Sequence, residues 1–248
     1  SNLMIKLNMK KTILLLILAT ISVISCRKDD PTSTEPEVSI ETQNTYDDQA
    51  IVEFLKTHYL DARGNVKDFV ETDTVNTKLF DLNPVTLPSG VVYVKKASSQ
   101  PVPGTEIGDK DSLRLMNIAT TYVAQSTDGK VKFGSSYPFR NTVSTGNPEV
   151  DPAYYYVKNS VLAAFNTKYG TSYDHSYYEI EGFREALQKF RAFDIPDEDN
   201  YNLQGVIIVP SRAAFARDPH FNYSNISFRN RSFIFNFQVY KTTPRMIP

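Results

Sequence analysis

The chain has 248 residues, of which 41% are hydrophobic and 22% are charged, and its formal net charge is −1. This composition excludes a disordered or membrane-embedded chain and suits a globular body of one or two domains. The near-zero charge supplies no basic field, so the sequence predicts no nucleic-acid partner. Tryptophan is absent, and fifteen Phe and fifteen Tyr supply the large side chains of the core.

Residues 1–25 have the pattern of a secretory signal peptide. Lys10 and Lys11 precede the apolar run Thr12–Val23, which is too short to span a bilayer. The run leads to Cys26, the only cysteine, so no internal disulfide is possible. The residues before Cys26 resemble the bacterial lipoprotein signal, which implies lipidation of Cys26 and a membrane anchor worth about 0.8 kcal/mol per buried methylene.

A charged run follows the cysteine directly. Lys28, Asp29 and Asp30 resemble the export signal with which Bacteroidota move lipoproteins to the cell surface. The resemblance implies an outer-membrane lipoprotein exposed at the surface; the alternative is a solvated charge run at the head of a linker. Residues 26–45 are rich in Pro, Ser, Thr and Glu, and we expect them to form a flexible tether.

Residues 46–87 are predicted to form a helix and a connector. Asp47 or Asp48 is placed to cap a helix that runs to about Tyr59 and presents Ile51 and Phe54 on its apolar face. The region Gly64–Pro88 lacks periodicity and is expected to pack against the main body as an extended connector.

Residues 88–242 read as strands surrounding an amphipathic helix. The helix covers Glu179–Phe190, where apolar residues recur at spacings of three and four. A further helix is expected between a Pro152 start and a Gly170 stop, and Thr243–Pro248 is expected to be a frayed tail. This order predicts an α+β domain with an antiparallel sheet curved over one helix. The expected strands are Val91–Val94, Leu113–Val123, Val131–Phe133, Gln204–Val209 and Phe233–Tyr240.

The sequence lacks the motifs of metal, cofactor and nucleophile chemistry. His58, His175 and His220 stand far apart, so neither a metal site nor a cofactor is expected. No G-x-S-x-G, P-loop or dinucleotide fingerprint occurs. Glu179 and its neighbours Glu181 and Glu185 read as the solvated face of the helix.

Four segments, in order along residues Pro88–Lys241, resemble the FKBP-type peptidyl-prolyl isomerases. The resemblance implies a curved antiparallel sheet wrapped on one helix, here with a helical insertion at 137–177. The N-terminal helix and the lipoprotein head resemble the Bacteroidota branch of that family. The four segments are Asp128–Ser136, Ile180–Leu187, Val209–Ala216 and Phe233–Val239.

The resemblance also implies a cup that takes up a proline ring. Isomerisation needs neither a nucleophile nor a cofactor, because the barrier of about 18–20 kcal/mol is the amide resonance lost when the peptide bond twists. An apolar pocket favours the twisted amide over the planar, solvated one. The alternative for each cup residue is an ordinary place in the core. By position, the cup would be lined by Tyr122, Phe133, Phe139, Ile180, Phe183, Phe215 and Phe235.

Two departures from the family predict weak turnover. Gly134 replaces an aspartate after Phe133, and Phe215 replaces a tyrosine whose hydroxyl would bind the substrate carbonyl. Each missing hydrogen bond is worth about 0.5–1.5 kcal/mol.

The insertion at 137–177 is long enough to carry structure or function of its own. Because Tyr154, Tyr155 and Tyr156 are consecutive, we expect that they cannot all face inward and that the exposed ones contact a protein partner. The alternative is that the insertion merely pads the domain.

Two functions therefore remain open. The first is a weak isomerase that binds proline-containing polypeptides and assists exported or outer-membrane proteins. The second is a non-catalytic accessory subunit of an outer-membrane secretion or assembly complex.

Overall fold

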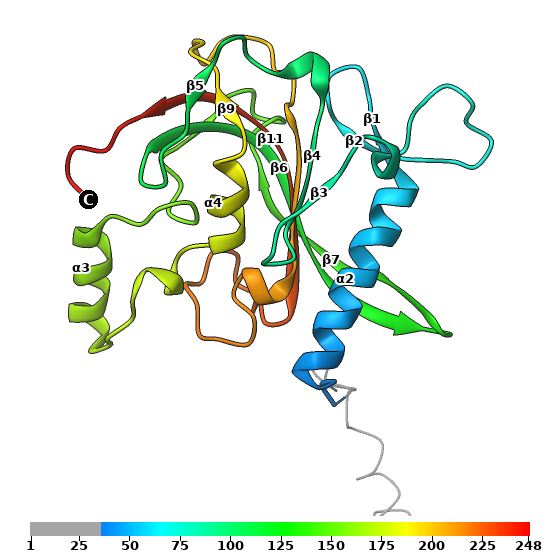
Figure 1. Cartoon of the computed structure of the whole chain (residues 1–248). Helices are drawn as coiled ribbons and strands as arrows, with labels where there is room; N and C mark the ends of the chain where they lie inside the picture. The colour runs from blue at the N-terminus through cyan, green and yellow to red at the C-terminus, as the bar shows by residue number, and fades with distance from the viewer. Residues whose placement is uncertain (1–35) are drawn as a thin grey trace, which may run out of the picture. The chain divides into compact units, whose positions relative to one another are not determined.

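Three α-helices and a mainly antiparallel set of strands make up residues 36–248, the part that the computed structural model describes (Figure 1). The predicted α+β class is thereby confirmed. Cys26, Lys28, Asp29 and Asp30 lie outside the described residues. The helices are α2 (Ile40–Thr57), α3 (Asn159–Tyr169) and α4 (Glu181–Leu187). Within residues 36–248, no helix combines the length and the apolar character needed to cross a membrane.

One sheet of seven strands forms the centre of the fold. Its strands follow the order β3-β4-β10-β11-β6-β7, with β8 paired to β6, and every pair is antiparallel. Two smaller antiparallel pairs, β1-β2 and β5-β9, flank it. The strands are β1 (His58–Leu60), β2 (Val66–Asp68), β3 (Val85–Thr86), β4 (Val92–Lys95), β5 (Thr105–Glu106), β6 (Ser112–Thr127), β7 (Lys130–Asn141), β8 (Glu149–Val150), β9 (Arg191–Ala192), β10 (Gly205–Val209) and β11 (Arg231–Thr243).

The sheet separates two hydrophobic cores, because successive side chains of a strand point to opposite faces. Ile207 and Phe235 belong to the core beneath α4, which we call the α4-side core. Their chain neighbours Ile208 and Ile234 belong to the core beneath α2, the α2-side core. In Figure 1 the two helices lie on opposite sides of the sheet, which curves round α4.

Gly182 explains how closely α4 approaches the sheet. A Cβ atom at this position would lie 2.7 Å from a methyl carbon of Val91, 2.7 Å from one of Val209 and 2.9 Å from the carbonyl oxygen of Ala213. No larger residue fits without a shift of the helix. The predicted helix is confirmed, although its α-helical part is the shorter stretch Glu181–Leu187.

The N-terminal helix is longer than predicted and begins at Ile40, inside the expected tether. Asp47 does not cap it: the side chain is fully buried, and its carboxylate accepts hydrogen bonds from Gln43 Nε2 at 2.9 Å and from the Ser211 amide at 2.9 Å. The Gln43 amide also donates to the carbonyl oxygen of Ala124 on β6 at 3.1 Å. Gln43, in the range predicted as a tether, and Asp47, the predicted cap, therefore both hold α2 against the rest of the fold.

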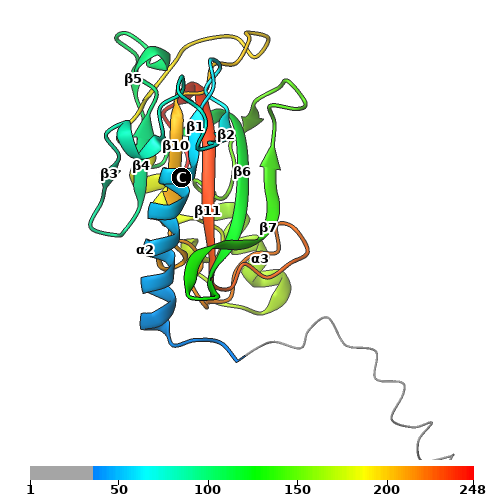
Figure 2. The same cartoon turned by 90° about the vertical axis from the view of Figure 1, so that its right-hand side faces the viewer.

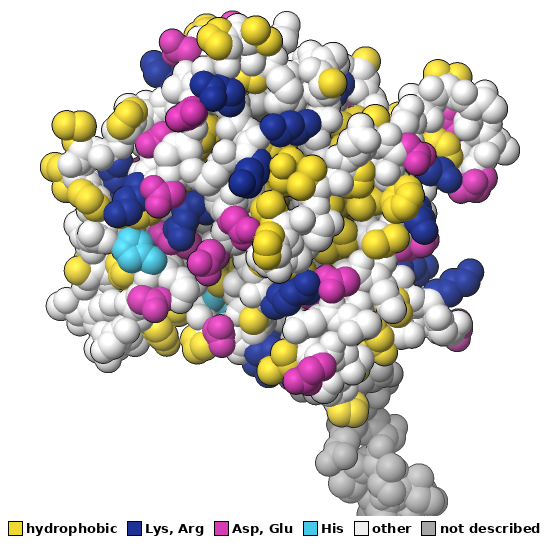
Figure 3. Space-filling model, in the orientation of Figure 1, with side chains coloured by type: hydrophobic (Ala, Val, Ile, Leu, Met, Phe, Trp, Pro, Cys, Tyr) yellow, Lys and Arg dark blue, Asp and Glu magenta, His cyan; other side chains and the backbone are white. Residues whose placement is uncertain are grey.

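The α2 face also carries exposed hydrophobic side chains. Figure 3 shows such side chains gathered beside α2 and the adjoining β3 segment. Val52 on α2 and Val85 on β3 are 42% and 41% exposed.

The insertion helix ends as predicted but starts later. Gly170 adopts a left-handed conformation (φ 63°) and donates its amide to the carbonyl oxygen of Asn166, as a helix-ending glycine does. Pro152 starts a turn rather than the helix, because the Tyr155 amide donates to its carbonyl oxygen at 3.0 Å. The helix itself begins at Asn159.

The C-terminal segment is anchored as far as Arg245, so the expected tail is shorter than predicted: Met246 and Ile247 are 90% and 81% exposed. Strand β11 continues to Thr243. The Arg245 side chain is only 6% exposed, pairs with Asp151, and donates through Nε to the carbonyl oxygen of Lys110 at 2.8 Å.

Candidate functional site

Five of the seven predicted cup residues meet in the α4-side core. Ile180 precedes α4 and Phe183 lies in it, while Phe139 comes from β7 and Phe235 from β11. Phe215 follows the short 3₁₀ helix η4 (Ser211–Ala213). The Phe183 ring stacks on Phe235 with centroids 4.0 Å apart, and we call this ring pair the floor of the cluster.

Tyr122 and Phe133 do not join them. Both pack against the α2-side core, on the other face of the sheet, with their ring centroids 5.3 Å apart. Residues 133 and 139 are six apart and would share a face in a regular strand. One register shift between β6 and β7, at Thr121/Val123, lies between these two residues, and Ser135 has φ 49°, so the alternation is reset and Phe133 faces α2. The assignment of these two residues to the cup was wrong.

The space above the Phe183 floor is filled. The fully buried ring of Tyr154 lies 6.0 Å from Phe183, 6.0 Å from Phe235 and 5.0 Å from Phe139, measured between centroids. All five cup residues in this core are 5% exposed or less. A proline ring therefore finds no free surface on the floor in this conformation.

Two aromatic residues of the 214–230 loop complete the cover. Tyr223 and Phe228 lie 5.6 and 5.5 Å from Phe139, and Phe228 lies 6.0 Å from Phe215. The guanidinium of Arg140 lies over three of these rings, 4.5 Å from the Phe139 centroid. The sequence analysis missed Tyr223 and Phe228; the available signal was the density of aromatic residues in this loop.

The three consecutive tyrosines are all buried, so the expectation that some face outward was wrong. Tyr154, Tyr155 and Tyr156 are 0%, 1% and 5% exposed. They sit in the turn before α3 rather than on a helix, so no helical periodicity directs one of them to solvent. Tyr155 donates its hydroxyl to the carbonyl oxygen of Gly108, and Tyr156 lies between His175 and Arg245.

The Tyr154 hydroxyl is fixed by a polar network. It donates to Glu149 Oε2 at 2.6 Å and accepts from Asn117 Nδ2 at 3.0 Å, and Arg140 pairs with Glu149 at 3.2 Å. Burial, aided by the nearby carboxylate of Glu149, raises the pKa of Tyr154 well above its ordinary value. The phenol thus stays neutral and bonded in the middle of an apolar cluster.

The two predicted departures from the family lie in different environments. Phe215 is 2% exposed and stacks on His220, with centroids 4.8 Å apart. His220 Nε2 accepts from the Phe228 amide at 3.0 Å, and Nδ1 lies 3.0 Å from the Phe221 carbonyl oxygen, an arrangement that suits the Nδ1-protonated neutral ring. A side chain at Gly134 would instead meet the exposed Gln125, so an aspartate there would not point into the cup.

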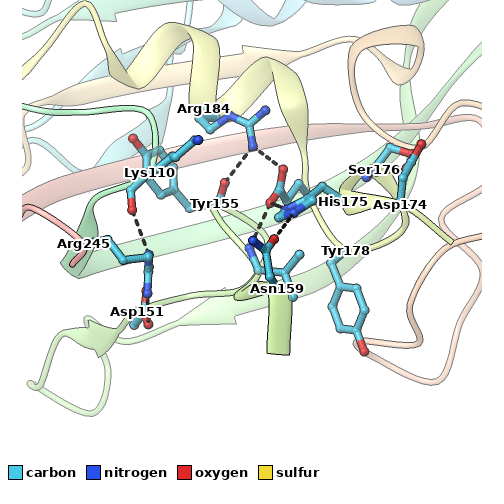
Figure 4. Close-up of polar contacts among 12 residues, drawn as sticks. Lys110, Asp151, Tyr155, Asn159, Asp174, His175, Ser176, Tyr178, Arg184 and Arg245 are labelled. Atoms are coloured by element: carbon cyan, nitrogen blue, oxygen red, sulfur yellow. Dashed lines mark hydrogen bonds and ion pairs between the residues drawn. The ribbon is translucent and has the colours of Figure 1, made fainter. Parts of the chain in front are cut away.

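A buried carboxylate fastens the insertion to α4. Glu179 is 3% exposed, so the predicted solvated face was wrong for this residue, whereas Glu181 is exposed. The Glu179 Oε2 atom accepts from the Val157 amide at 2.9 Å. His175 Nδ1 lies 2.8 Å from the same oxygen, and Arg184 pairs with Oε1. Figure 4 shows Arg184, Tyr155, His175 and Asn159 converging here, with Arg245 and Asp151 nearby. The Ile180 amide also donates to the carbonyl oxygen of Tyr154 at 2.8 Å, so these bonds hold Tyr154 over the floor.

The arrangement lacks the features of metal or nucleophilic chemistry. Among residues 36–248, no three His, Cys, Asp or Glu side chains are grouped to hold a metal ion. His175 and Glu179 are engaged with Asn159, Val157 and Arg184. The site is a buried aromatic cluster. The carboxylates at its edge, Glu149 and Glu179, are paired with Arg140 and Arg184.

Comparison with known proteins gives little further. No family model matches the chain, and no curated protein matches it. Among solved structures, it is similar to a peptidyl-prolyl cis-trans isomerase from Pseudomonas syringae pv. tomato str. DC3000. That alignment covers 85% of this chain and 100% of the other, at 9% identity and a TM-score of 0.36. So low a score does not establish a shared fold.

Proposed function

We propose that this chain is an FKBP-like surface lipoprotein that serves as a non-catalytic accessory subunit of an outer-membrane complex. The observation that carries the non-catalytic part is the position of Tyr154, which occupies the cup above Phe183 and Phe235. The sequence resemblance to the isomerase family supports the fold assignment, as does an antiparallel sheet that curves round a single helix.

A filled cup opposes turnover because displacing Tyr154 to admit a proline ring costs free energy. To admit a proline ring, Tyr154 would have to leave a fully buried position and give up its bond to Glu149. Removing a buried aromatic side chain from a core costs about 3–5 kcal/mol. At about 1.4 kcal/mol per factor of ten, proline binding would weaken by about 10²–10⁴-fold.

The location is proposed from the sequence. Lipidation of Cys26 would anchor the domain, and Lys28, Asp29 and Asp30 would direct it to the outer face. Protease added to intact cells should release the domain, and a variant with alanine at the three charged positions should become protected while staying membrane-bound. A wild-type domain that is already protected would refute surface export.

A slow isomerase remains a second candidate because part of the cover belongs to a loop. Tyr223 lies in the segment 214–230, which has neither α-helix nor strand, and is only partly buried. Its hydroxyl donates to the carbonyl oxygen of Tyr178, so a single bond and ring contacts hold it over Phe139. Displacement of this loop would uncover the Phe215 side of the cluster.

The test is the isomerisation rate of a short proline peptide. The wild type should leave the rate at its uncatalysed value. Tyr154→Leu, which shortens the side chain that fills the cup but keeps it apolar, should bind the peptide and raise the rate. The matched control is Tyr169→Leu, an exposed ring on α3 that touches no cup residue (58% exposed). A wild-type rate above the uncatalysed value, which Tyr169→Leu shares, would establish the second candidate and overturn the first.

A further inference from the structure

A hollow separate from the cup lies between the insertion and α4. Its volume of about 350 Å³ is within the range of about 300–1,000 Å³ that small-molecule sites occupy. Figure 2, in which α2 lies nearest the viewer, shows the insertion helix α3 beyond the sheet, so the hollow does not adjoin the α2-side core. We call it the polar hollow, and its lining includes Asp109, Lys110, Tyr156, Asn159, His175 and Arg184.

We propose that the polar hollow binds a small neutral carbohydrate through hydrogen bonds to the hydroxyl groups of the sugar. This inference goes beyond the proposed function, because none of these lining residues belongs to the cup and the site stands whether or not the cup is closed.

Tyr156 brings an unbonded hydroxyl to the hollow. The residue is only 5% exposed; its ring lies 5.3 Å from the His175 ring, and the Arg245 guanidinium lies 4.8 Å from its centroid. The hydroxyl end of this packed ring is therefore the part that reaches the hollow. Within residues 36–248 no group donates a hydrogen bond to this hydroxyl or accepts one from it, although a buried tyrosine usually finds a partner. A ligand in the hollow would supply that partner.

Three further side chains of the lining have unused hydrogen-bond donors. The Nη1 atom of Arg184 is engaged with Glu179, whereas its Nε and Nη2 have no partner among residues 36–248. Asn159 Oδ1 lies 2.7 Å from His175 Nε2, which leaves the Asn159 Nδ2 group unused. Lys110 is exposed, and its ammonium group makes no ion pair within the described part of the chain.

The hollow also offers one unused acceptor. Glu179 cannot serve, because its two oxygens already accept from the Val157 amide, lie 2.8 Å from His175 Nδ1 and pair with Arg184. Asp109 is exposed, and within residues 36–248 its carboxylate makes no ion pair.

The balance of charge and hydrogen-bonding groups selects the class of ligand. Arg184 is paired with Glu179, and the unpaired Lys110 is matched by the unpaired Asp109, so an ion gains little by entering. A sugar hydroxyl is neutral and both donates and accepts. One sugar can therefore bond the unused donors and the Asp109 carboxylate together, and sites built to bond a ligand hydroxyl discriminate strongly against ligands that lack it.

The experiment is an NMR titration of the full folded protein with glucose, galactose, mannose and N-acetylglucosamine, followed at the Tyr156 ring and the Arg184 Nε–H group. At least one sugar should give saturable shifts of both signals, and its affinity should not depend on the NaCl concentration, because salt does not screen a neutral ligand. Tyr156→Phe should weaken binding about two- to tenfold, as the loss of one hydrogen bond does. Its melting temperature should equal that of the wild type, since the hydroxyl has no partner in the protein.

Substitutions at the rim separate a sugar site from an anion site. Asp109→Ala should weaken the binding of a sugar, which loses an acceptor, but would tighten the binding of an anion, which loses a repelling charge. The matched control is Lys189→Met, which removes an exposed ammonium group outside the lining and should bind as the wild type does.

Three results would each overturn the proposal. The first is that none of the four sugars shifts both signals saturably up to high millimolar concentration. The second is wild-type affinity in both Tyr156→Phe and Asp109→Ala. The third is that glucuronate or inorganic phosphate binds at least tenfold more tightly than every neutral sugar, which would make the hollow an oxyanion site.

Discussion

Asp47 is a buried carboxylate that joins two distant parts of the chain. It sits on α2, yet the amide and the hydroxyl of Ser211, at the start of η4, both donate to it. Burial raises the pKa of Asp47 even though these hydrogen bonds and Arg212 act in the opposite direction. The contact therefore orients α2 at the cost of desolvating a charge.

The pH dependence of stability follows from the direction of that shift. A raised pKa means that the folded state binds a proton more tightly than the unfolded chain does. The contribution of Asp47 to stability is thus largest below about pH 3.9, the ordinary carboxyl value, and falls as the pH rises through the raised pKa. We expect the free energy of unfolding of the wild type, minus that of Asp47→Asn, to fall between pH 3.5 and pH 7.

Urea unfolding of both proteins at the two pH values measures this difference, in which the other titrating groups cancel. Asp48→Asn, a change at the neighbouring exposed carboxylate, is the control. A difference that grows with pH would mean that the hydrogen bonds of Ser211 and Gln43 outweigh desolvation.

The tyrosines of the insertion show what a sequence conveys about single residues and what it leaves out. The residue types that form the α4-side core were recognisable, because Phe139, Ile180, Phe183, Phe215 and Phe235 do meet there. The direction of Tyr154 was not recognisable, because it depends on a turn at Pro152 and on Glu149, 32 residues before α4. The face of Phe133 depends on the register shift between β6 and β7 beside Ser135, which no local pattern predicts.

Among the helices and strands, α4 shows most clearly how close packing restricts which residue a position can hold, here glycine at position 182. Alanine is a better helix former than glycine by about 0.8–1.0 kcal/mol. A Cβ at position 182 would nevertheless lie 2.7 Å from Val91 and Val209 and 2.9 Å from a backbone oxygen. Packing should outweigh propensity, since the backbone of Ala213 cannot rotate away as a side chain can.

We therefore expect Gly182→Ala to lower the free energy of unfolding by about 1–3 kcal/mol, as overpacking does. Glu185→Ala, on the outer side of the same helix, should change stability by about 0.5 kcal/mol or less. Denaturant unfolding of both variants measures the effect. A stabilised Gly182→Ala protein would show that helix propensity governs this position.

The insertion and α4 are joined at Glu179. Replacing it by glutamine leaves Arg184 without its charged partner, and breaking a buried pair costs up to about 3–5 kcal/mol. We expect the backbone amide of Val157, which donates to Glu179, to exchange with solvent faster in Glu179→Gln. Hydrogen exchange measures this, with the exposed Glu181→Gln as control. Unchanged exchange at Val157 would mean that ring packing alone holds the insertion down.

At the scale of residues 40–248, one sheet presents two different aromatic surfaces. On the α4 side the rings are buried and bonded, whereas on the α2 side Tyr122 and Phe133 border an open groove. The strands and the single central helix could be anticipated from alternation and periodicity. The extension of β7 to Asn141 and of α2 to Ile40 could not, because tertiary pairing rather than local preference sets both ends.

NMR tests most directly whether Tyr154 closes the cup. Titrating a short Ala-Leu-Pro-Phe peptide into protein with labelled aromatic rings separates the two surfaces, because Phe183, Phe235 and Tyr154 report the cup while Tyr122 and Phe133 report the groove. If Tyr154 closes the cup, the ring signals of Phe183, Phe235 and Tyr154 should stay in place up to millimolar peptide. Saturable shifts of these three signals would instead show that the wild-type cup admits proline and that Tyr154 does not close it.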